Sequence, residues 1–265
     1  MPSFRNITIG QYIPGDSILH QLDPRTKILV TLLLVIGLFF IDSFWGYGAV
    51  AVYIGLAILL SGIPPRFLFR GLRPVLAIII LTFVLNSFMT EGEPIWQWGF
   101  LVLTKDGLVR GGMLAVRLIL LIVGTSILTL TTSPIALTDG LESLLNPGKK
   151  MGIPAHELAM MMTIALRFIP TLLEEAEKIM KAQMARGADF ESGNLIQRAK
   201  SLLPLLVPLF VSAFRRADEL AVAMEARCYR GGEGRTKLNL LVFRAVDYLA
   251  LVGSVLFIGY LAWVF

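Results

Sequence analysis

Two short stretches of the chain combine a helix-ending pattern with an arginine. Ala185-Arg186-Gly187 closes one charged stretch, and Ala226-Arg227-Cys228 closes another. The planar guanidinium of arginine binds a carboxylate through two parallel hydrogen bonds, so an arginine at a protruding helix tip can dock in an acidic groove. The helix dipole alone also favours an arginine near a helix C-terminus. Two such tips in one chain favour the docking role and predict a partner with two similar grooves.

The two stretches that carry these tips resemble each other. At an offset of 41 residues, Glu177 matches Asp218 and Ala182 matches Ala223. Ile179 and Leu220 match at the same offset, as do the two Ala-Arg pairs. The tips are therefore expected to be two versions of one feature rather than two unrelated helix ends.

Helical periodicity predicts the elements that position the tips. Between Thr132 and Asn239 charged residues return, and an apolar stripe at helical spacing is formed by Leu158, Met161, Met162, Ala165, Leu166 and Ile169. Pro170 is expected to kink or end this helix. Residues 172–187 and 215–232 are expected to form exposed amphipathic helices. The apolar stretch 202–214 is too short for a membrane span and is expected to be interfacial or buried.

The composition excludes a water-soluble domain. Of the 265 residues, 55% are hydrophobic and 16% charged, and the mean hydropathy is +0.72. Soluble domains carry about 25% charged residues, and disordered chains combine low hydrophobicity with high charge. One cysteine and two histidines supply neither a disulfide framework nor a metal-ligand pattern. The fold class predicted is an all-α integral membrane protein.

The apolar runs predict about five transmembrane helices, because a span needs roughly 20 apolar residues. Asp42 is the only Asp, Glu, Lys or Arg between Ile28 and Leu60, and Asp42-Ser43 supplies turn chemistry. This stretch is interpreted as two short spans, with one long tilted helix as the alternative. The expected spans are residues 28–41, 44–60, 74–89, 111–130 and 240–264.

Positive charge near the span ends predicts the orientation. The N-terminal segment and the loop containing Arg66, Arg70 and Arg73 are basic, whereas Glu91 and Glu93 follow the third span. The N-terminus and residues 132–239 are therefore expected in the cytoplasm, and five spans place the C-terminus outside. The basic residues behind the net charge of +5 are explained by this orientation, so nucleic acid is not an expected partner. Membrane lipid is an expected partner. Three regions are predicted: 1–131 in the membrane, 132–239 cytoplasmic, and 240–265 as a final span.

The chain lacks the motifs of the common catalytic sites. It contains no Gly-x-x-x-x-Gly-Lys-Ser/Thr loop, no His-Glu-x-x-His pair and no Gly-x-Ser-x-Gly elbow. No catalytic residue, metal ligand or cofactor is therefore predicted. Three ionisable residues lie within expected spans. Arg117 is expected to extend to the interface, and Arg244 and Asp247 are expected to pair on one helix face.

The motif Leu22-Asp-Pro-Arg-Thr-Lys27, together with Met184–Gly187 and Glu225–Cys228, resembles the EcfT family. This is the transmembrane coupling subunit of energy-coupling factor ABC transporters, with CbiQ and BioN as relatives. The resemblance covers essentially the whole chain. It implies that residues 132–239 form coupling helices and that Ala185, Arg186 and Gly187 dock in one ATPase subunit. Ala226, Arg227 and Cys228 would dock in the other. Cys228 departs from the glycine of the family pattern, which puts the helix-ending geometry there in doubt.

The resemblance also implies the partners and the mechanism. Two ABC-type ATPase subunits would hydrolyse ATP, and a separate membrane S-component would bind a vitamin or other micronutrient. This chain would be the non-catalytic scaffold between them. The unequal tips favour two different ATPase chains. Two alternatives from other classes are a self-sufficient carrier or channel, which needs a polar path through the membrane, and an enzyme acting on lipid-linked substrates.

Overall fold

The computed structural model describes residues 12–98, 101–152, 154–188, 190, 200–232 and 241–264. The chain divides into two compact units. The main unit comprises Gly10–Leu144 and Leu240–Phe265, and the inserted unit comprises Met1–Ile9 and Leu145–Asn239. The main unit thus consists of two separate parts of the sequence, with almost all of the inserted unit between them.

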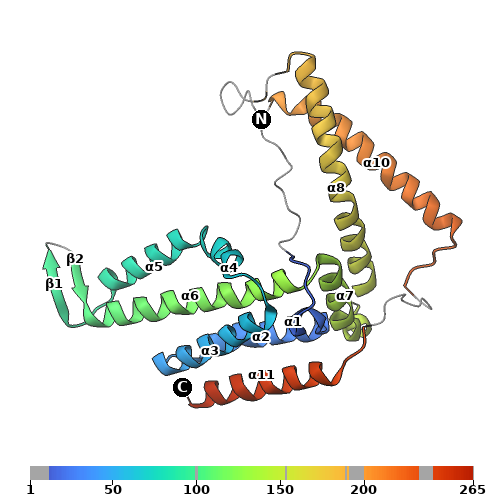
Figure 1. Ribbon diagram of the computed structural model, residues 1–265. Helices are drawn as coiled ribbons and strands as arrows, with labels where there is room; N and C mark the ends of the chain where they lie inside the picture. The colour runs from blue at the N-terminus through green and yellow to red at the C-terminus, as the bar shows by residue number, and fades with distance from the viewer. Residues whose placement is uncertain are drawn as a thin grey trace. The chain divides into compact units, whose positions relative to one another are not determined.

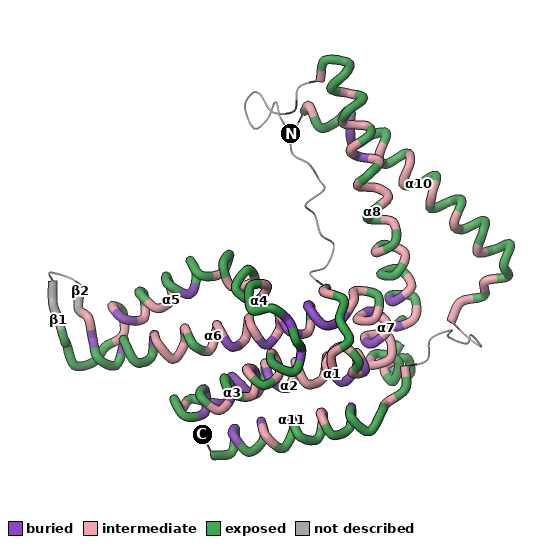
Figure 2. The backbone as a smooth tube through the Cα atoms, in the orientation of Figure 1, coloured by how far each residue is buried: buried purple, intermediate pink, exposed green. Residues whose placement is uncertain are grey.

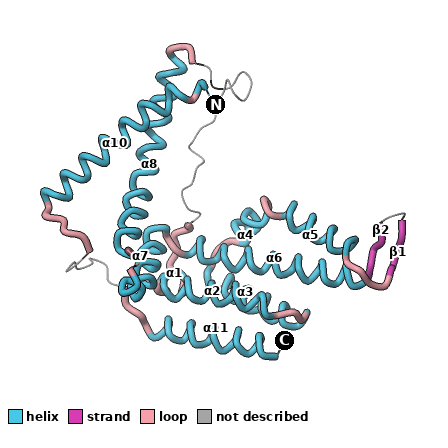
Figure 3. Tube along the Cα trace, turned by 180° about the vertical axis from the view of Figure 1, so that it is seen from behind, coloured by secondary structure: helices cyan, strands magenta, loops and turns pink. Residues whose placement is uncertain are grey.

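Helices make up most of the described chain (Figures 1 and 3). The main unit contains α1 (Ile18–Gln21), α2 (Pro24–Phe40), α3 (Phe44–Ser61), α4 (Pro65–Leu72), α5 (Leu76–Met89), β1 (Pro94–Trp98), β2 (Leu101–Thr104), α6 (Lys105–Thr131), α7 (Pro134–Leu145) and α11 (Ala245–Val264). The inserted unit contains the 3₁₀ helix η2 (Asn146–Met151), α8 (Ala155–Ala185) and α10 (Leu203–Ala226). Strands β1 and β2 pair as an antiparallel hairpin.

The stretch from Ile28 to Leu60 forms two helices, as the turn chemistry at Asp42-Ser43 predicts. Helix α2 ends at Phe40, and α3 begins after its N-cap residue Ser43. The alternative of one long tilted helix is wrong, because residues 41–43 are not helical.

By length and composition, α3, α6, α8 and α11 are long and apolar enough to cross a membrane. Helices α4 and α5, bent by 58°, add a fifth candidate if they form one broken span. The 17-residue α2 is slightly shorter than these. Helix α8 lies in the segment expected to be cytoplasmic, and its second half carries the acidic and basic residues 174–181. The side of the membrane on which α8 lies stays a prediction.

The core of the main unit lies where α2, α3, α6 and α11 meet. Leu38, Ile41 and Leu130 are at most 1% exposed there. The opposite pattern holds on the outward faces, where Leu59 is 78% and Trp263 is 85% exposed. Figure 2 shows these faces of α3 and α11 as largely exposed. Apolar surface on this scale is unstable in water and is typical of helices that face lipid.

Glycines allow the helices of the main unit to approach closely. A Cβ atom at Gly37 of α2 would overlap the Cγ2 atom of Ile258 in α11. A Cβ at Gly124 of α6 would lie 2.8 Å from Leu34 Cδ2 in α2. Small residues at such positions let helices pack by van der Waals contact, which drives association where lipid removes the hydrophobic effect.

Helix α6 packs along α5 through a second pair of glycines. A Cβ at Gly107 would lie 2.7 Å from the carbonyl oxygen of Asn86 and 2.9 Å from that of Ser87. One turn later, a Cβ at Gly111 would lie 3.0 Å from the carbonyl oxygen of Phe83. The Gly-x-x-x-Gly spacing therefore brings the two backbones into contact, as in other membrane helix pairs.

The inserted unit is built on two long helices. Helix α8 runs for 31 residues through Pro170, so the proline does not end it. Helix α10 has Pro204 in its first turn, where the missing N–H is not needed, and continues past Pro208 to the second tip. The apolar stretch 202–214 thus falls in the first half of α10. Sequence reasoning missed α4 and α7.

Candidate functional site

The first arginine tip ends α8 with a tight set of backbone hydrogen bonds. Arg186 N–H donates to Gln183 O at 3.0 Å, and Gly187 N–H donates to Met184 O at 2.9 Å. The next residue, Ala188, donates from its N–H to Gln183 O at 3.0 Å. Gly187 has φ +87°, which a glycine adopts without steric cost.

The second tip repeats these three bonds at matched positions. Arg227 N–H donates to Met224 O at 3.1 Å, and Cys228 N–H donates to Glu225 O at 2.8 Å. Tyr229 N–H donates to Met224 O at 3.0 Å. Cys228 takes a φ of +55°, the left-handed conformation of Gly187, although it is not glycine. The doubt raised by Cys228 about the helix ending is therefore resolved: the ending is kept, at a strain of about 1–2 kcal/mol.

Both tips present their side chains to the surroundings. All six predicted docking residues are exposed: Ala185, Arg186, Gly187, Ala226, Arg227 and Cys228. Within the described part of the chain, neither tip guanidinium forms an ion pair or hydrogen bond. Each is therefore available for a carboxylate on another molecule. The structure places both tips in the inserted unit but at separate helix ends, so they form two sites rather than one.

A polar cluster joins α8 to α10. The carboxylate of Glu175 accepts a hydrogen bond from Ser212 Oγ at 2.6 Å through Oε1 and from Arg216 Nη2 at 2.9 Å through Oε2. The side chains of Arg216 and Glu175 are 38% and 25% exposed. Further along, Gln183 Nε2 lies 3.4 Å from Pro204 O. Figure 1 shows α8 and α10 crossing in this region.

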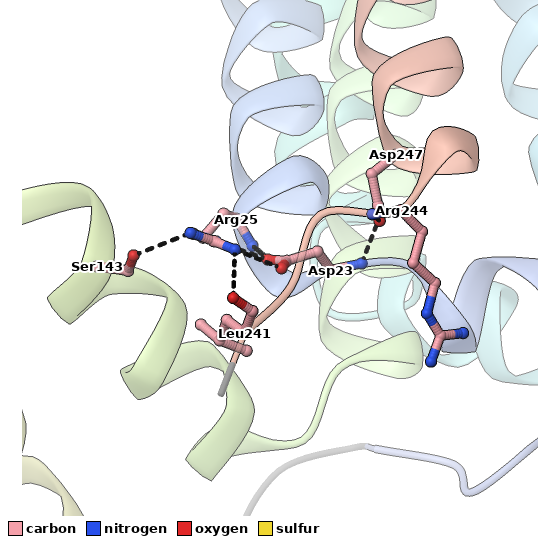
Figure 4. A network of polar contacts seen from close by, with 6 residues as sticks. All are labelled: Asp23, Arg25, Ser143, Leu241, Arg244 and Asp247. Atoms are coloured by element: carbon pink, nitrogen blue, oxygen red, sulfur yellow. Dashed lines mark hydrogen bonds and ion pairs between the residues drawn. The ribbon is translucent and has the colours of Figure 1, made fainter. Parts of the chain in front are cut away.

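The motif Leu22–Lys27, at the start of α2, forms a network of hydrogen bonds (Figure 4). Asp23 caps α2 by accepting from Arg25 N–H at 2.9 Å. The Arg25 side chain returns to the same carboxylate, with Nε 3.0 Å from Oδ1 and Nη2 2.8 Å from Oδ2. It also donates from Nη1 to Ser143 Oγ at 3.3 Å and from Nη2 to Leu241 O at 3.0 Å. One guanidinium thus holds α7 and the segment before α11 against the start of α2.

Burial and hydrogen bonding act in opposite directions on Asp23. Burial raises the pKa of its carboxyl, but the hydrogen bonds and the charge of Arg25 lower it more, so the pKa lies below its ordinary value. The carboxylate is therefore ionised at neutral pH, which keeps both the helix cap and the ion pair in place.

Asp247 links the starts of α2 and α11. Its Oδ1 accepts from Asp23 N–H at 2.7 Å, and its Oδ2 accepts from Arg244 N–H at 2.8 Å. Asp247 is 2% exposed. The expected pairing of Arg244 with Asp247 is thus made by the backbone of Arg244, while Figure 4 shows the Arg244 side chain directed away from the carboxylate.

Two other basic residues bind helix ends. Lys27 Nζ donates to His20 O and to Thr131 O, both at 3.1 Å, so it satisfies the carbonyls left unpaired at the ends of α1 and α6. Arg117 Nη2 donates to Ile41 O at 2.9 Å and to Asp42 Oδ1 at 2.7 Å, which ties α6 to the turn between α2 and α3. Its extension to the membrane interface stays a prediction.

A cavity of about 380 Å³ lies within the main unit, lined by α1, α2, α3, α6 and α11. Its wall is mainly apolar, and several polar groups on it bind the protein itself. Tyr53 and Ser254 hydroxyls lie 2.7 Å apart, Lys27 binds two carbonyls, and Thr31 Oγ1 donates to Lys27 O at 2.8 Å. In the ranges that the structure describes, no cluster of three or more His, Cys, Asp or Glu could hold a metal ion. The first 11 residues and residues 191–199 and 233–240 lie outside those ranges.

The fold defines an all-α, multi-pass membrane protein with an inserted helical unit. Residues 15–238 match the family model of CbiQ, described as a cobalt transport protein. Relatives named energy-coupling factor transporter transmembrane protein EcfT share 63% identity over 250 residues in Thermosediminibacter oceani, 58% over 248 in Clostridium kluyveri and 51% over 251 in Bacillus subtilis. These alignments cover 94%, 93% and 94% of this chain and 94%, 92% and 95% of the respective relatives. The chain belongs to this EcfT and CbiQ family and is a multi-pass protein of the bacterial cell membrane.

Proposed function

We propose that this chain is the coupling subunit of an energy-coupling factor importer. In this role Arg186 docks in one ABC-type ATPase subunit and Arg227 in a second. The main unit contacts a membrane S-component that binds a vitamin or other micronutrient. ATP is hydrolysed by the ATPases, and this chain transmits their motion without a catalytic residue of its own.

The single observation that carries the proposal is the equivalence of the two tips. They share three backbone hydrogen bonds at matched positions, a residue in the left-handed conformation directly after the arginine, and an exposed guanidinium. A helix dipole explains one terminal arginine, but it does not explain two identically shaped endings with free guanidinium groups. Two equivalent donors fit two equivalent carboxylate-bearing grooves. Gly187 and Cys228 differ in size, which favours two different ATPase chains.

The proposed topology follows from charge. The N-terminus and residues 132–239 lie in the cytoplasm, where the ATPases bind, and residues 1–131 and 240–265 provide the membrane part.

The cluster at Arg25 supports a mechanical role for the connection between the units. Ser143 lies just before the chain leaves the main unit, and Leu241 lies just after it returns. Because one guanidinium holds both, displacement of this connection acts directly on the start of α2.

The experiment is purification of the tagged chain from its own cells in mild detergent, with mass spectrometry of the proteins retained. The chain is expected to retain two ATPase chains and a small membrane protein. The double variant Arg186→Glu/Arg227→Glu should lose the ATPases, because it places a carboxylate against a carboxylate. Lys150→Glu is the matched control, since it reverses an exposed charge of the inserted unit away from both tips.

Two results would contradict the proposal. The double variant could retain both ATPases at the level of the unaltered chain, which would exclude the arginines from docking. Alternatively, liposomes containing this chain alone could accumulate labelled cobalt ion or biotin, which would favour a self-sufficient carrier. The apolar cavity, whose lysine, tyrosine and serine groups bind the protein itself, argues against that carrier.

A further inference from the structure

Helices α8 and α10 match each other well beyond their tips. At the offset of 41 residues that relates Arg186 to Arg227, Thr171 matches Ser212 and Ala176 matches Ala217. Glu175 matches Arg216, so an acid in one helix stands where the other has a base. Together with the shared hydrogen bonds at the tips, these matches make α8 and α10 two copies of one structural unit.

The two copies touch each other at a matched position. Glu175 and Arg216, which are 41 residues apart in sequence, form the 2.9 Å ion pair between the helices. The ion pair therefore joins the two helices at equivalent positions.

The contacts also give the directions of the two helices. Position 175 of α8 contacts 212 and 216 of α10, whereas position 183 contacts 204. Residue numbers rise along one helix as they fall along the other, so the helices run in opposite directions past each other. Each arginine tip lies 11 residues beyond the ion pair (186 − 175 and 227 − 216), or roughly 16 Å along its helix.

We infer that Glu175 and Arg216, with Ser212, form the positioning contact that sets the separation of the two tips. This inference rests on the proposed function for its partner: a pair of ATPase subunits. A rigid pair of tips at the correct spacing binds both subunits at once, and simultaneous binding strengthens attachment by roughly a hundredfold over one tip alone. Loss of the contact leaves each tip intact but removes their common spacing.

Because positions 175 and 216 are equivalent, exchanging their two charges should preserve the contact. In the double variant Glu175→Arg/Arg216→Glu, the carboxylate moves to the counterpart position in α10. The matching hydroxyl in α8 is that of Thr171, the counterpart of Ser212. The ion pair and its hydroxyl donor are thus expected to form again with their roles exchanged between the helices.

The first test measures the spacing of the tips in the full chain in detergent. Lys181 and Val222 are matched and exposed, so Lys181→Cys and Val222→Cys can carry spin labels in a Cys228→Gly background. Pulsed electron paramagnetic resonance is expected to give one narrow distance distribution. Glu175→Arg alone and Arg216→Glu alone should broaden or shift it, and the exchanged double variant should restore it.

The second test measures the affinity of the detergent-purified chain for its two co-purifying ATPase subunits. Each single variant is expected to weaken the binding of the ATPase pair by about a hundredfold, and the exchange should recover it. The control is the neighbouring matched pair, Glu174→Arg and Arg215→Glu, because these exposed side chains undergo the same charge reversals. If Glu175→Arg yields aggregated protein, Glu175→Gln and Arg216→Lys replace the single variants in both tests.

Restoration of the distance and of the affinity by the exchange would establish the positioning contact. Unchanged distances in the single variants, or a double variant as defective as either single one, would overturn it. Failure of the proposed function has a different signature. In that case the unaltered chain binds no ATPase pair, while the distance measurement still decides whether the contact sets the spacing.

Discussion

Arg25 Nη2 lies 3.0 Å from the carbonyl oxygen of Leu241, although 216 residues separate the two in sequence. The same guanidinium reaches Ser143 Oγ, and both partners flank the connection to the inserted unit. Within the main unit, the Arg25 side chain therefore joins the start of α2 to Ser143, just before the chain enters the inserted unit, and to Leu241, just after it returns.

Arg25→Ala is expected to destabilise the main unit by about 3 kcal/mol, because it removes one partner of a buried ion pair and leaves Asp23 uncompensated. Arg25→Lys should recover only part of the loss, since an ammonium lacks the fork that reaches three groups. Thermal unfolding in detergent measures both variants. Arg66→Ala, which removes an exposed arginine, is the control. Equal melting temperatures for Arg25→Ala and Arg66→Ala would exclude the clamp.

Acid should weaken the same network. The pKa of Asp23 is lower in the folded protein than in the unfolded chain, so its contribution is complete above the unfolded pKa of about 3.9. The contribution is lost as the pH falls through the lower, folded pKa. Asp23→Asn should therefore be less stable than the unaltered chain at pH 7, and this difference should shrink below about pH 4. A difference that stays constant from pH 7 to pH 3 would contradict the role of the carboxylate.

The left-handed residue at each tip offers a matched pair of substitutions. Cys228→Gly should slow hydrogen exchange at the amides of Arg227, Cys228 and Tyr229 by a few-fold, because it relieves a strain of about 1 kcal/mol. Gly187→Cys should accelerate exchange at the corresponding amides of α8 by a similar factor. Hydrogen exchange read by mass spectrometry reports both ends separately. Identical exchange in Cys228→Gly and the unaltered chain would show that the φ of +55° carries no cost.

Replacement of Gly107 by alanine should disturb the close packing of α5 on α6, whereas replacement of Gly112 should not. Gly107→Ala places a methyl group within 3 Å of two backbone carbonyl oxygens, which cannot move independently of α5. A loss of about 2 kcal/mol is expected from such overpacking. Gly112→Ala meets nothing within 4 Å and is the control. The measurement is the melting temperature in detergent, and a loss for Gly112→Ala as large as that for Gly107→Ala would contradict the packing.

Local features were predictable because they depend on neighbouring residues. Apolar runs, the Asp42-Ser43 break and the arginine-glycine ending of α8 each act over one or two helical turns. Pro170 shows the limit of such signals, since it removes one hydrogen bond but the rest of α8 continues the helix. The pairing of Arg216 with Glu175 was not predicted, because the 41-residue offset relates the two helices in sequence and carries no information about which residues touch.

The sequence by itself determined that this is a helical membrane protein, where its first two helices separate, and that it carries two arginine tips. Only the tertiary structure decided that Cys228 keeps the helix ending and that Arg117 binds Asp42. It also decided that the carboxylate of Asp247 binds the backbone of Asp23, 224 residues away. The reason is physical: periodicity and capping arise from short-range geometry along one helix. The choice among several charged partners depends on which helix ends the packing brings within 3 Å.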